Sequence, residues 1–124
     1  MRGNYLTAAR LYLDHPEEFE AALEEEQAAR HKAVLIIQAA EKLGYHLTDD
    51  NREPEIVTAR NACARLLRER GLTLMEIGRL LGRQYSAVVH MLGKVADWEL
   101  MPKMYAKELA VLEAIRREVE GQAR

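Results

Sequence analysis

Side chains that can recognise the edges of nucleic-acid bases are concentrated in one short segment. They combine a forked cation, an amide, hydroxyls, a small apolar group and an imidazole, in Arg83, Gln84, Tyr85, Ser86, Ala87 and His90. In the major groove of duplex DNA, bases are distinguished by hydrogen bonds to such polar groups and by apolar contacts with thymine methyl groups. Lys94 adds a cation that suits a phosphate. These residues predict a DNA-binding site.

The residues around this segment predict the two helices that would present it. Thr73 followed by Glu76 is typical of a capping box, and Gly82 suits the left-handed residue that ends a helix. Gly78 is small where the two helices must approach each other. Apolar residues recur at helical spacing, as Ile77, Leu80 and Leu81 in the first helix and Val88, Leu92 and Val95 in the second. Residues 73–94 therefore predict a helix-turn-helix, which places its second helix in the major groove.

Charge is distributed unevenly along the chain, although the net charge is only −2. Residues 1–57 carry six Lys and Arg against twelve Asp and Glu; residues 58–94 carry seven against two, a net charge of +5; residues 95–124 carry five against six. Screening limits electrostatic attraction to about 8–10 Å at physiological salt, so the local charge matters more than the total. The basic segment favours duplex DNA as the partner. The alternative is that these arginines only solvate helix faces.

The rest of the chain predicts further helices and no strand, because helix-favouring Ala, Leu, Glu and Arg dominate it. We expect a short helix over residues 5–13, a long one over 15–43, a polar connection over 45–53 with a helical turn after Thr48, a helix over 54–70 and, after a break beyond Asp97, a last helix over 103–120. The fold class predicted is all-α, a compact helical bundle.

Apolar spacing predicts which face of each of these helices is buried. The predicted stripe of the long helix is Phe19, Ala22, Leu23, Ala33, Ile36, Ile37, Ala40 and Leu43. In the helix over residues 54–70 it is Ile56, Ala59, Cys63, Leu66 and Leu67. In the last helix it is Tyr105, Leu109, Leu112, Ile115 or Arg116, and Val119.

Three stretches of the sequence, taken in order, are similar to one known family. They are IIQAAEKLGYHLTDD (residues 36–50), ARNACARLLRERG (59–71) and TLMEIGRLLGRQYSAVVHMLGKV (73–95). Together they resemble the C-terminal DNA-binding domain of the bacterial replication initiator DnaA, which implies a DnaA/Trp-repressor-like helix-turn-helix within the bundle. The resemblance implies three parts: an N-terminal helical extension (1–33), the DNA-binding domain (34–97) and a C-terminal helix (98–124).

The resemblance also implies roles for particular residues. In the family an arginine near the start of the long helix enters the minor groove, and Arg60 matches it; residues 83–87 match the turn and helix start that read the major groove. The family usually has Asp-His-Thr-Thr where this chain has Gln84, Tyr85, Ser86 and Ala87. Because Asp accepts from the cytosine amino group whereas Gln pairs best with adenine, we expect a different target sequence.

Two further departures bear on affinity and activity. The segment NREPE (residues 51–55) carries two Glu where the family has several basic residues. Each phosphate contact that is lost in this way reduces the slope of log affinity against log salt concentration by about 0.9. No GxxxxGK[ST] loop occurs in the sequence, so the family's ATPase is not expected. The resemblance suggests a small bacterial protein that regulates transcription or assists DNA replication. Additional phosphate contacts are predicted at Arg65, Arg68, Arg79 and Lys94.

No catalytic, metal or cofactor site is predicted. The four His residues do not stand in a metal-ligand spacing with one another or with Cys63, which lies mid-helix on an apolar face without a base partner. Asp49 and Asp50 fit a capped polar loop better than an acid–base pair. We expect a protein that is not an enzyme. A lone cysteine, no signal-peptide pattern and no long apolar run favour the cytoplasm and no membrane partner.

Two alternatives remain open. The last helix either packs on the bundle or pairs with a second copy to form a homodimer, which would set two recognition helices about 34 Å apart. The chain as a whole is either a sequence-specific DNA-binding protein or a protein-interaction module that keeps a DnaA-like scaffold. The changed residues 84–87 and the acidic residues 51–55 motivate the second interpretation.

Overall fold

The computed structural model describes residues 16–47 and 52–122. Within these ranges the chain forms five α-helices and no β-strand, which confirms the all-α prediction. The helices are α2 (Pro16–Lys42), α3 (Pro54–Glu69), α4 (Leu74–Leu81), α5 (Tyr85–Leu100) and α6 (Ala106–Gln122). The helix predicted over residues 5–13 and the helical turn predicted after Thr48 lie outside the described residues.

The helices begin where the sequence offers residues that favour a first turn. Pro16 and Pro54 each occupy the first position of a helix, where the missing N–H of proline costs no hydrogen bond. Glu17 and Glu18 then lie at the positive end of the α2 dipole. Both starts agree with the sequence prediction, and the ends of α2 and α3 fall within one residue of it.

The chain divides into two compact units between His31 and Lys32, inside α2. In the first unit, the described side chains of residues 16–31 are exposed, including Ala22 and Leu23. The prediction that Ala22 and Leu23 are buried was therefore wrong, as it was for Leu43 in the second unit, which is 40% exposed. Apolar spacing identifies the face that a helix can bury, but burial also requires another element to cover that face.

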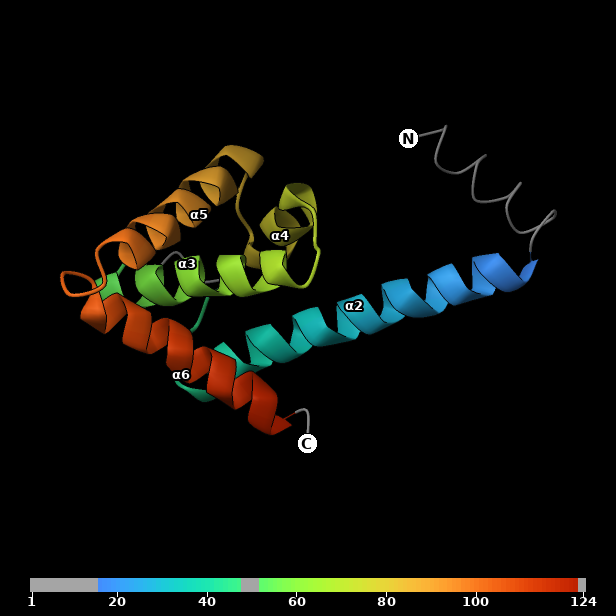
Figure 1. Cartoon of the computed structure of the whole chain (residues 1–124), viewed down its shortest axis with the longest axis horizontal. Helices are drawn as coiled ribbons and strands as arrows, with labels where there is room; N and C mark the ends of the chain where they lie inside the picture. The colour runs from blue at the N-terminus through green and yellow to red at the C-terminus, as the bar shows by residue number, and fades with distance from the viewer. Residues whose placement is uncertain (1–15, 48–51, 123–124) are drawn as a thin grey trace. The chain divides into compact units, whose positions relative to one another are not determined.

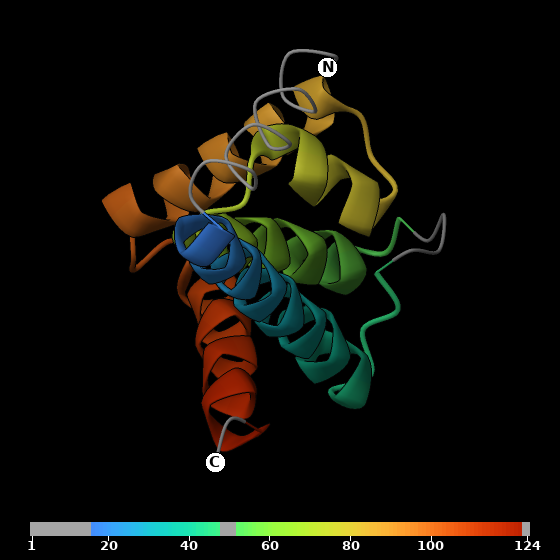
Figure 2. The same cartoon turned by 90° about the vertical axis from the view of Figure 1, so that its right-hand side faces the viewer.

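The second unit is built around α3. In Figures 1 and 2, α4 and α5 lie on one side of α3 and α6 lies on the other. The predicted inner residues of α3 are all buried. The core also takes in the last turns of α2 and the inner faces of α5 and α6, through residues that include Ala33, Ile36, Ala40, Val88, Val95, Leu112, Ile115 and Val119.

The last helix, α6, packs on α3 and α5. Ile115 is fully buried in the interface, whereas the neighbouring Arg116 reaches its rim and forms an ion pair with Glu69 at 3.2 Å. Tyr105 and Leu109 are partly buried against the same core. Packing on the bundle, the first of the two alternatives for this helix, is therefore what the structure has.

Helix α5 continues three residues beyond the predicted break at Asp97. Trp98 is only 4% exposed and contributes to the core, and the backbone N–H of Met101 still donates to the carbonyl of Asp97 at 3.1 Å. The helix ends before Pro102, whose ring prevents it from continuing. The predicted break was wrong because burial of the Trp98 indole stabilises one further helical turn.

Candidate nucleic-acid interface

The first helix of the predicted helix-turn-helix begins with a complete capping box. The Glu76 backbone N–H donates to Thr73 Oγ1 at 3.1 Å, and the Thr73 backbone N–H donates to Glu76 Oε1 at 3.0 Å. These two bonds satisfy donors that the start of a helix otherwise leaves unpaired. The capping box predicted from Thr73 and Glu76 is confirmed, and it fixes the first residue of α4.

The turn between α4 and α5 depends on two glycines. Gly82 has φ +65°, the left-handed conformation that ends α4, as predicted. A Cβ placed on Gly78 would lie 2.5 Å from the carbonyl oxygen of Arg83, and the Arg83 N–H donates to the Gly78 carbonyl at 2.8 Å. Gly78 is thus required for close approach, as predicted, but the nearest atom belongs to the turn rather than to α5.

The turn delivers polar side chains to the start of α5. Gln84 is the N-cap residue, with φ −76° and ψ 158°, and no side chain caps the helix start by a hydrogen bond. Tyr85 is 57% exposed. The first-turn N–H groups therefore keep the partial positive charge of a helix N-terminus, in a segment with no acidic residue in that turn.

A stripe of exposed side chains continues along α5 from this start. Ser86, His90 and Lys94 are all exposed and are spaced four residues apart, so they lie on one face of the helix. Ala87 differs from these three, because it is half-buried and packs against the core cluster. Arg83 and Ala87 are thus the half-buried members of the set predicted to read the major groove.

An open groove lies beside the turn, between α4 and the start of α5. Its volume is about 440 Å³. It is lined by Met75, Gly78, Arg79, Gly82, Arg83, Gln84 and Tyr85. The groove brings Arg79 of α4 next to the predicted base-reading residues. Met75 was missed by the sequence analysis, although its 53% exposure places it opposite the buried face formed by Ile77 and Leu81.

Arg60 does not lie with these residues on the surface. It is 4% exposed, and its Nε donates to the carbonyl oxygen of Leu47 at 2.9 Å. A buried guanidinium that holds the chain before α3 has a structural role, because extracting it into a DNA groove would leave that carbonyl without its donor. The minor-groove role expected of Arg60 is not supported by this placement.

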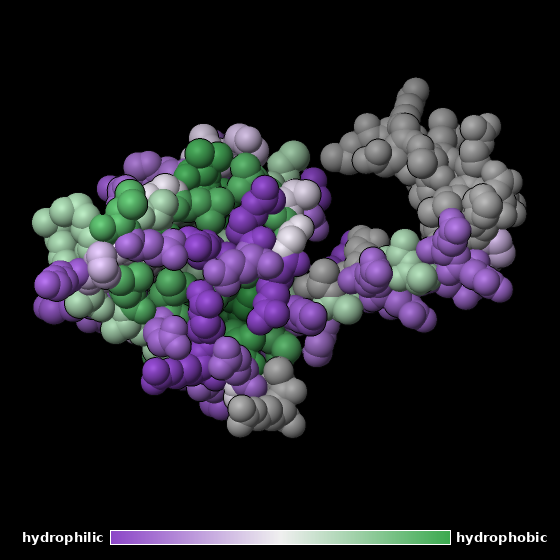
Figure 3. Space-filling view, in the orientation of Figure 1, coloured by the Kyte–Doolittle hydropathy of each residue, from purple (hydrophilic) through white to green (hydrophobic). Residues whose placement is uncertain are grey.

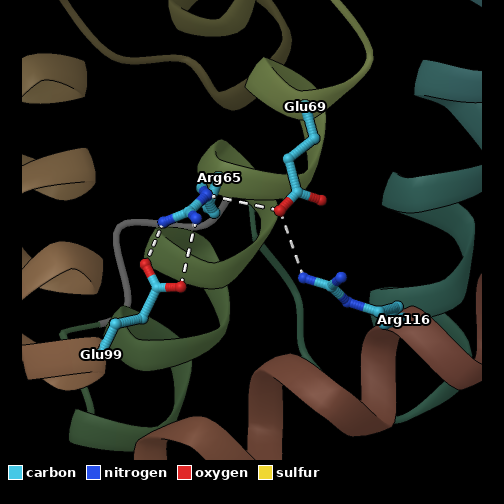
Figure 4. A network of polar contacts seen from close by, with 4 residues as sticks. All are labelled: Arg65, Glu69, Glu99 and Arg116. Carbon is cyan, nitrogen blue, oxygen red and sulfur yellow. Dashed lines mark hydrogen bonds and ion pairs between the residues drawn. The ribbon is translucent and has the colours of Figure 1, made fainter.

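Arg65 is likewise engaged by residues of other helices, although it stays partly exposed (Figure 4). Its guanidinium forms two hydrogen bonds with the carboxylate of Glu99 on α5 and lies 3.4 Å from Glu69, which also pairs with Arg116 of α6. The hydrogen bonding with Glu99 raises the pKa of Arg65, against the opposing effect of burial. This network joins α3, α5 and α6, so Arg65 is not available as the predicted phosphate contact.

Arg68 is exposed, but its Nη1 donates to the Leu72 carbonyl at 2.8 Å and so holds the loop that precedes α4. Arg79 and Lys94 are exposed as well, and they lie on the helix-turn-helix itself. Of the four additional phosphate contacts predicted from the sequence, we therefore keep these two.

The described part of the chain also bears on three other roles, which are nucleophilic catalysis, metal binding and membrane insertion. Burial raises the pKa of Cys63 to about 12, so its thiol is protonated at physiological pH and is not a nucleophile. Across residues 16–47 and 52–122, no three His, Cys, Asp or Glu side chains come together as a metal site would need. No helix within these residues is long and apolar enough to cross a membrane.

Comparison with protein-family models, with curated proteins and with solved structures finds no match to this chain.

Proposed function

We propose that this protein binds double-stranded DNA, with the start of α5 in the major groove. The observation that carries the proposal is the helix-turn-helix itself: a capped α4, a tight turn held by Gly78 and Gly82, and an uncapped α5 that presents polar side chains at its N-terminus. A helix N-terminus with exposed amide, hydroxyl and cationic neighbours suits both phosphates and base edges.

Individual roles follow from position in the turn and chemistry. Arg83 and Gln84, in the turn, are the groups able to make paired hydrogen bonds, to guanine and to adenine respectively. Tyr85, Ser86 and His90 lie next to them on the exposed side of α5. Arg79 and Lys94 flank this set on α4 and α5 and would bind phosphates.

The resemblance to the DNA-binding domain of DnaA supports the same proposal and suggests the context. On that basis we propose a small regulatory or replication-accessory protein that acts in the bacterial cytoplasm and is not an enzyme. Reading of the minor groove is left out of the proposal, because Arg60 is buried. With Arg79, Arg83 and Lys94 as the cations, the logarithm of affinity should fall with the logarithm of salt with a slope of roughly −3.

The experiment that tests this function is selection from a randomised duplex pool. The purified protein is titrated against the pool at low and at physiological salt, and the DNA that stays bound is sequenced. Enrichment of one motif at both salt concentrations is the expected result. Binding that disappears with salt and enriches no motif would contradict sequence-specific recognition and favour the protein-interaction alternative. Gln84→Ala serves as the matched variant, since its side chain makes no capping hydrogen bond.

A further inference from the structure

The sulfur-containing side chains of the described residues differ in their exposure and in their place on the molecule. Cys63 and Met91 are buried, at 0% and 7% exposed, whereas Met75 is 53% exposed. Met101 and Met104 are exposed as well, but they follow the C-terminal end of α5. A helix of 16 residues places that end about 24 Å from the proposed base-reading residues. Within the described chain, Met75 is therefore the exposed thioether that lies beside those residues.

Met75 belongs to the open groove between α4 and the start of α5. It lines this groove together with Arg83, Gln84 and Tyr85. At the top of the view in Figure 3, where α4 and the start of α5 lie, hydrophobic and hydrophilic side chains share the surface. A small dissolved molecule can therefore reach the Met75 side chain from solvent.

We propose that Met75 is a site of reversible oxidation that controls DNA binding: its thioether packs against the DNA backbone, and conversion to the sulfoxide releases the DNA. This inference rests on the DNA-binding function proposed above. It adds regulation of the same surface by a peroxide and names the atom on which the peroxide acts.

The position of Met75 on α4 accounts for its contact with the DNA backbone. Thr73 and Glu76, whose two capping hydrogen bonds hold the first turn of α4, lie on either side of it in the chain. In a helix-turn-helix the first helix crosses the sugar–phosphate backbone while the second enters the major groove. With α5 placed in this way, the first turn of α4 lies over a deoxyribose, whose C–H groups suit an adaptable apolar side chain.

The oxidation consumes one molecule of hydrogen peroxide. A lone pair of the Met75 sulfur attacks one peroxide oxygen, and the S–O bond forms as the O–O bond breaks. The second oxygen leaves as water after it takes the proton of the first. Sulfur is oxidised by two electrons and the peroxide is reduced by the same two. The product is a polar, chiral sulfoxide, which methionine sulfoxide reductases return to the thioether.

Both courses open to the sulfoxide oxygen in the complex weaken binding. Against the apolar sugar it loses its water without gaining a donor, which costs free energy. If it instead accepts a hydrogen bond from Arg79 or Arg83, which line the same groove, it draws that cation away from a phosphate or a base. Oxidation should therefore lower the affinity for DNA about tenfold, the order expected for a polar group buried without a partner.

The test compares two variants of the full chain that keep different exposed methionines. One carries Met75→Leu. The matched control combines Met101→Leu with Met104→Leu, which removes two exposed thioethers outside the groove and leaves Met75 in place. Each protein is treated with hydrogen peroxide until mass spectrometry shows that its exposed methionines are oxidised. Affinity for a duplex that carries the selected motif is measured before and after treatment, so that each variant is its own reference.

Peroxide should lower the affinity of the wild-type chain and of the control about tenfold and should not change that of Met75→Leu. Methionine sulfoxide reductases should restore the lost affinity. Circular dichroism should be the same before and after treatment, because the Met75 side chain lies outside the core. Affinity that survives oxidation of Met75, or that falls equally in Met75→Leu, would overturn the inference.

A protection measurement separates this inference from the proposed function. The wild-type chain is treated with peroxide while it is bound to the duplex, and the sulfoxide at each methionine is quantified by mass spectrometry. DNA should protect Met75, whereas Met101 and Met104 should be oxidised as in the free chain. Bound DNA that leaves Met75 unprotected would overturn the inference alone. A chain that binds no duplex before treatment would contradict the proposed function, and the inference with it.

Discussion

The arginines of α3 and the cations of the helix-turn-helix belong to one basic segment of the sequence but are used differently. In α3, Arg60 is bonded to the Leu47 carbonyl and Arg65 to the Glu99 carboxylate. In the helix-turn-helix, Arg79 and Lys94 are exposed. Arg83 is half-buried, lines the surface groove and donates from Nη1 to the carbonyl of the adjacent Gly82 at 3.1 Å. The comparison teaches that the net charge of a segment overstates the charge that a partner can reach.

The difference arises from the positions of the helices. Helix α3 is the central element, with neighbours on both sides, so its long side chains meet carbonyls and carboxylates of other elements. A buried or half-buried cation is stable only when it is paired. On the outer faces of α4 and α5, Arg79 and Lys94 are exposed to solvent.

The largest effect on this comparison should come from Arg60→Ala. Removing a buried guanidinium leaves the Leu47 carbonyl without its donor and a void beside α3, so the free energy of unfolding should fall by about 3 kcal/mol. Urea denaturation measures it. Arg79→Ala, on the exposed face, is the control and should change stability by less than about 0.5 kcal/mol. A stable Arg60→Ala protein with weakened DNA binding would restore the minor-groove interpretation.

Arg83→Ala should have the opposite profile, with a large effect on binding and a small one on folding. Loss of a forked cation that contacts a base should weaken binding to the selected motif by roughly 1–3 kcal/mol and relax base choice at one position. Competition titrations against single-base variants of the motif measure both effects. Unchanged affinity and selectivity would remove Arg83 from the proposed interface.

Gly78→Ala tests whether the turn itself positions the interface. Its Cβ would lie 2.5 Å from the Arg83 carbonyl oxygen, so the turn must shift, at an expected cost of about 1–3 kcal/mol in stability together with weaker DNA binding. Gly93→Ala on α5 is the matched control, because its Cβ meets nothing within 4 Å. That change should be neutral or stabilising. Equal behaviour of the two variants would show that the turn tolerates displacement.

The buried Cys63 thiol of α3 should also make the free energy of unfolding depend on pH. The Cys63 pKa is raised from 9.0 to about 12 in the folded chain, because burial disfavours the thiolate. The contribution of the neutral thiol to the free energy of unfolding is therefore fully present below pH 9 and is lost as pH rises towards 12. Between pH 8 and pH 10 this amounts to about 1 kcal/mol. Denaturation at both pH values should show a smaller decrease for Cys63→Ala than for the wild type. Equal decreases would assign the pH dependence to other groups.

The smallest effect is expected from Glu99→Gln, which weakens the pairing with Arg65 shown in Figure 4. Because both side chains are partly exposed, at 45% and 30%, stability should fall by less than about 1 kcal/mol, and by less still at high salt. Affinity for a single DNA site should not change. An increase in affinity would mean that Arg65, once released, reaches a phosphate, and would blur the contrast between α3 and the helix-turn-helix.

Much of the local structure could be predicted from the sequence because its causes are local. The Thr73–Glu76 capping box, the left-handed Gly82 and the starts of α2 and α3 each depend on residues within a few positions of one another. The extra turn of α5 could not be predicted in the same way. It depends on a pocket for Trp98, and that pocket exists only once the other helices have packed.

The sequence by itself determined the all-α class, the starts of α2 and α3, the capping box of α4 and the segment of polar residues between positions 83 and 94. Only the tertiary structure decided which cations face solvent, that Ala87 packs inward, and that apolar side chains are left exposed between α5 and α6. The physical reason is distance along the chain. Arg60 meets its acceptor 13 residues away and Arg65 meets Glu99 34 residues away, so no local pattern encodes either contact.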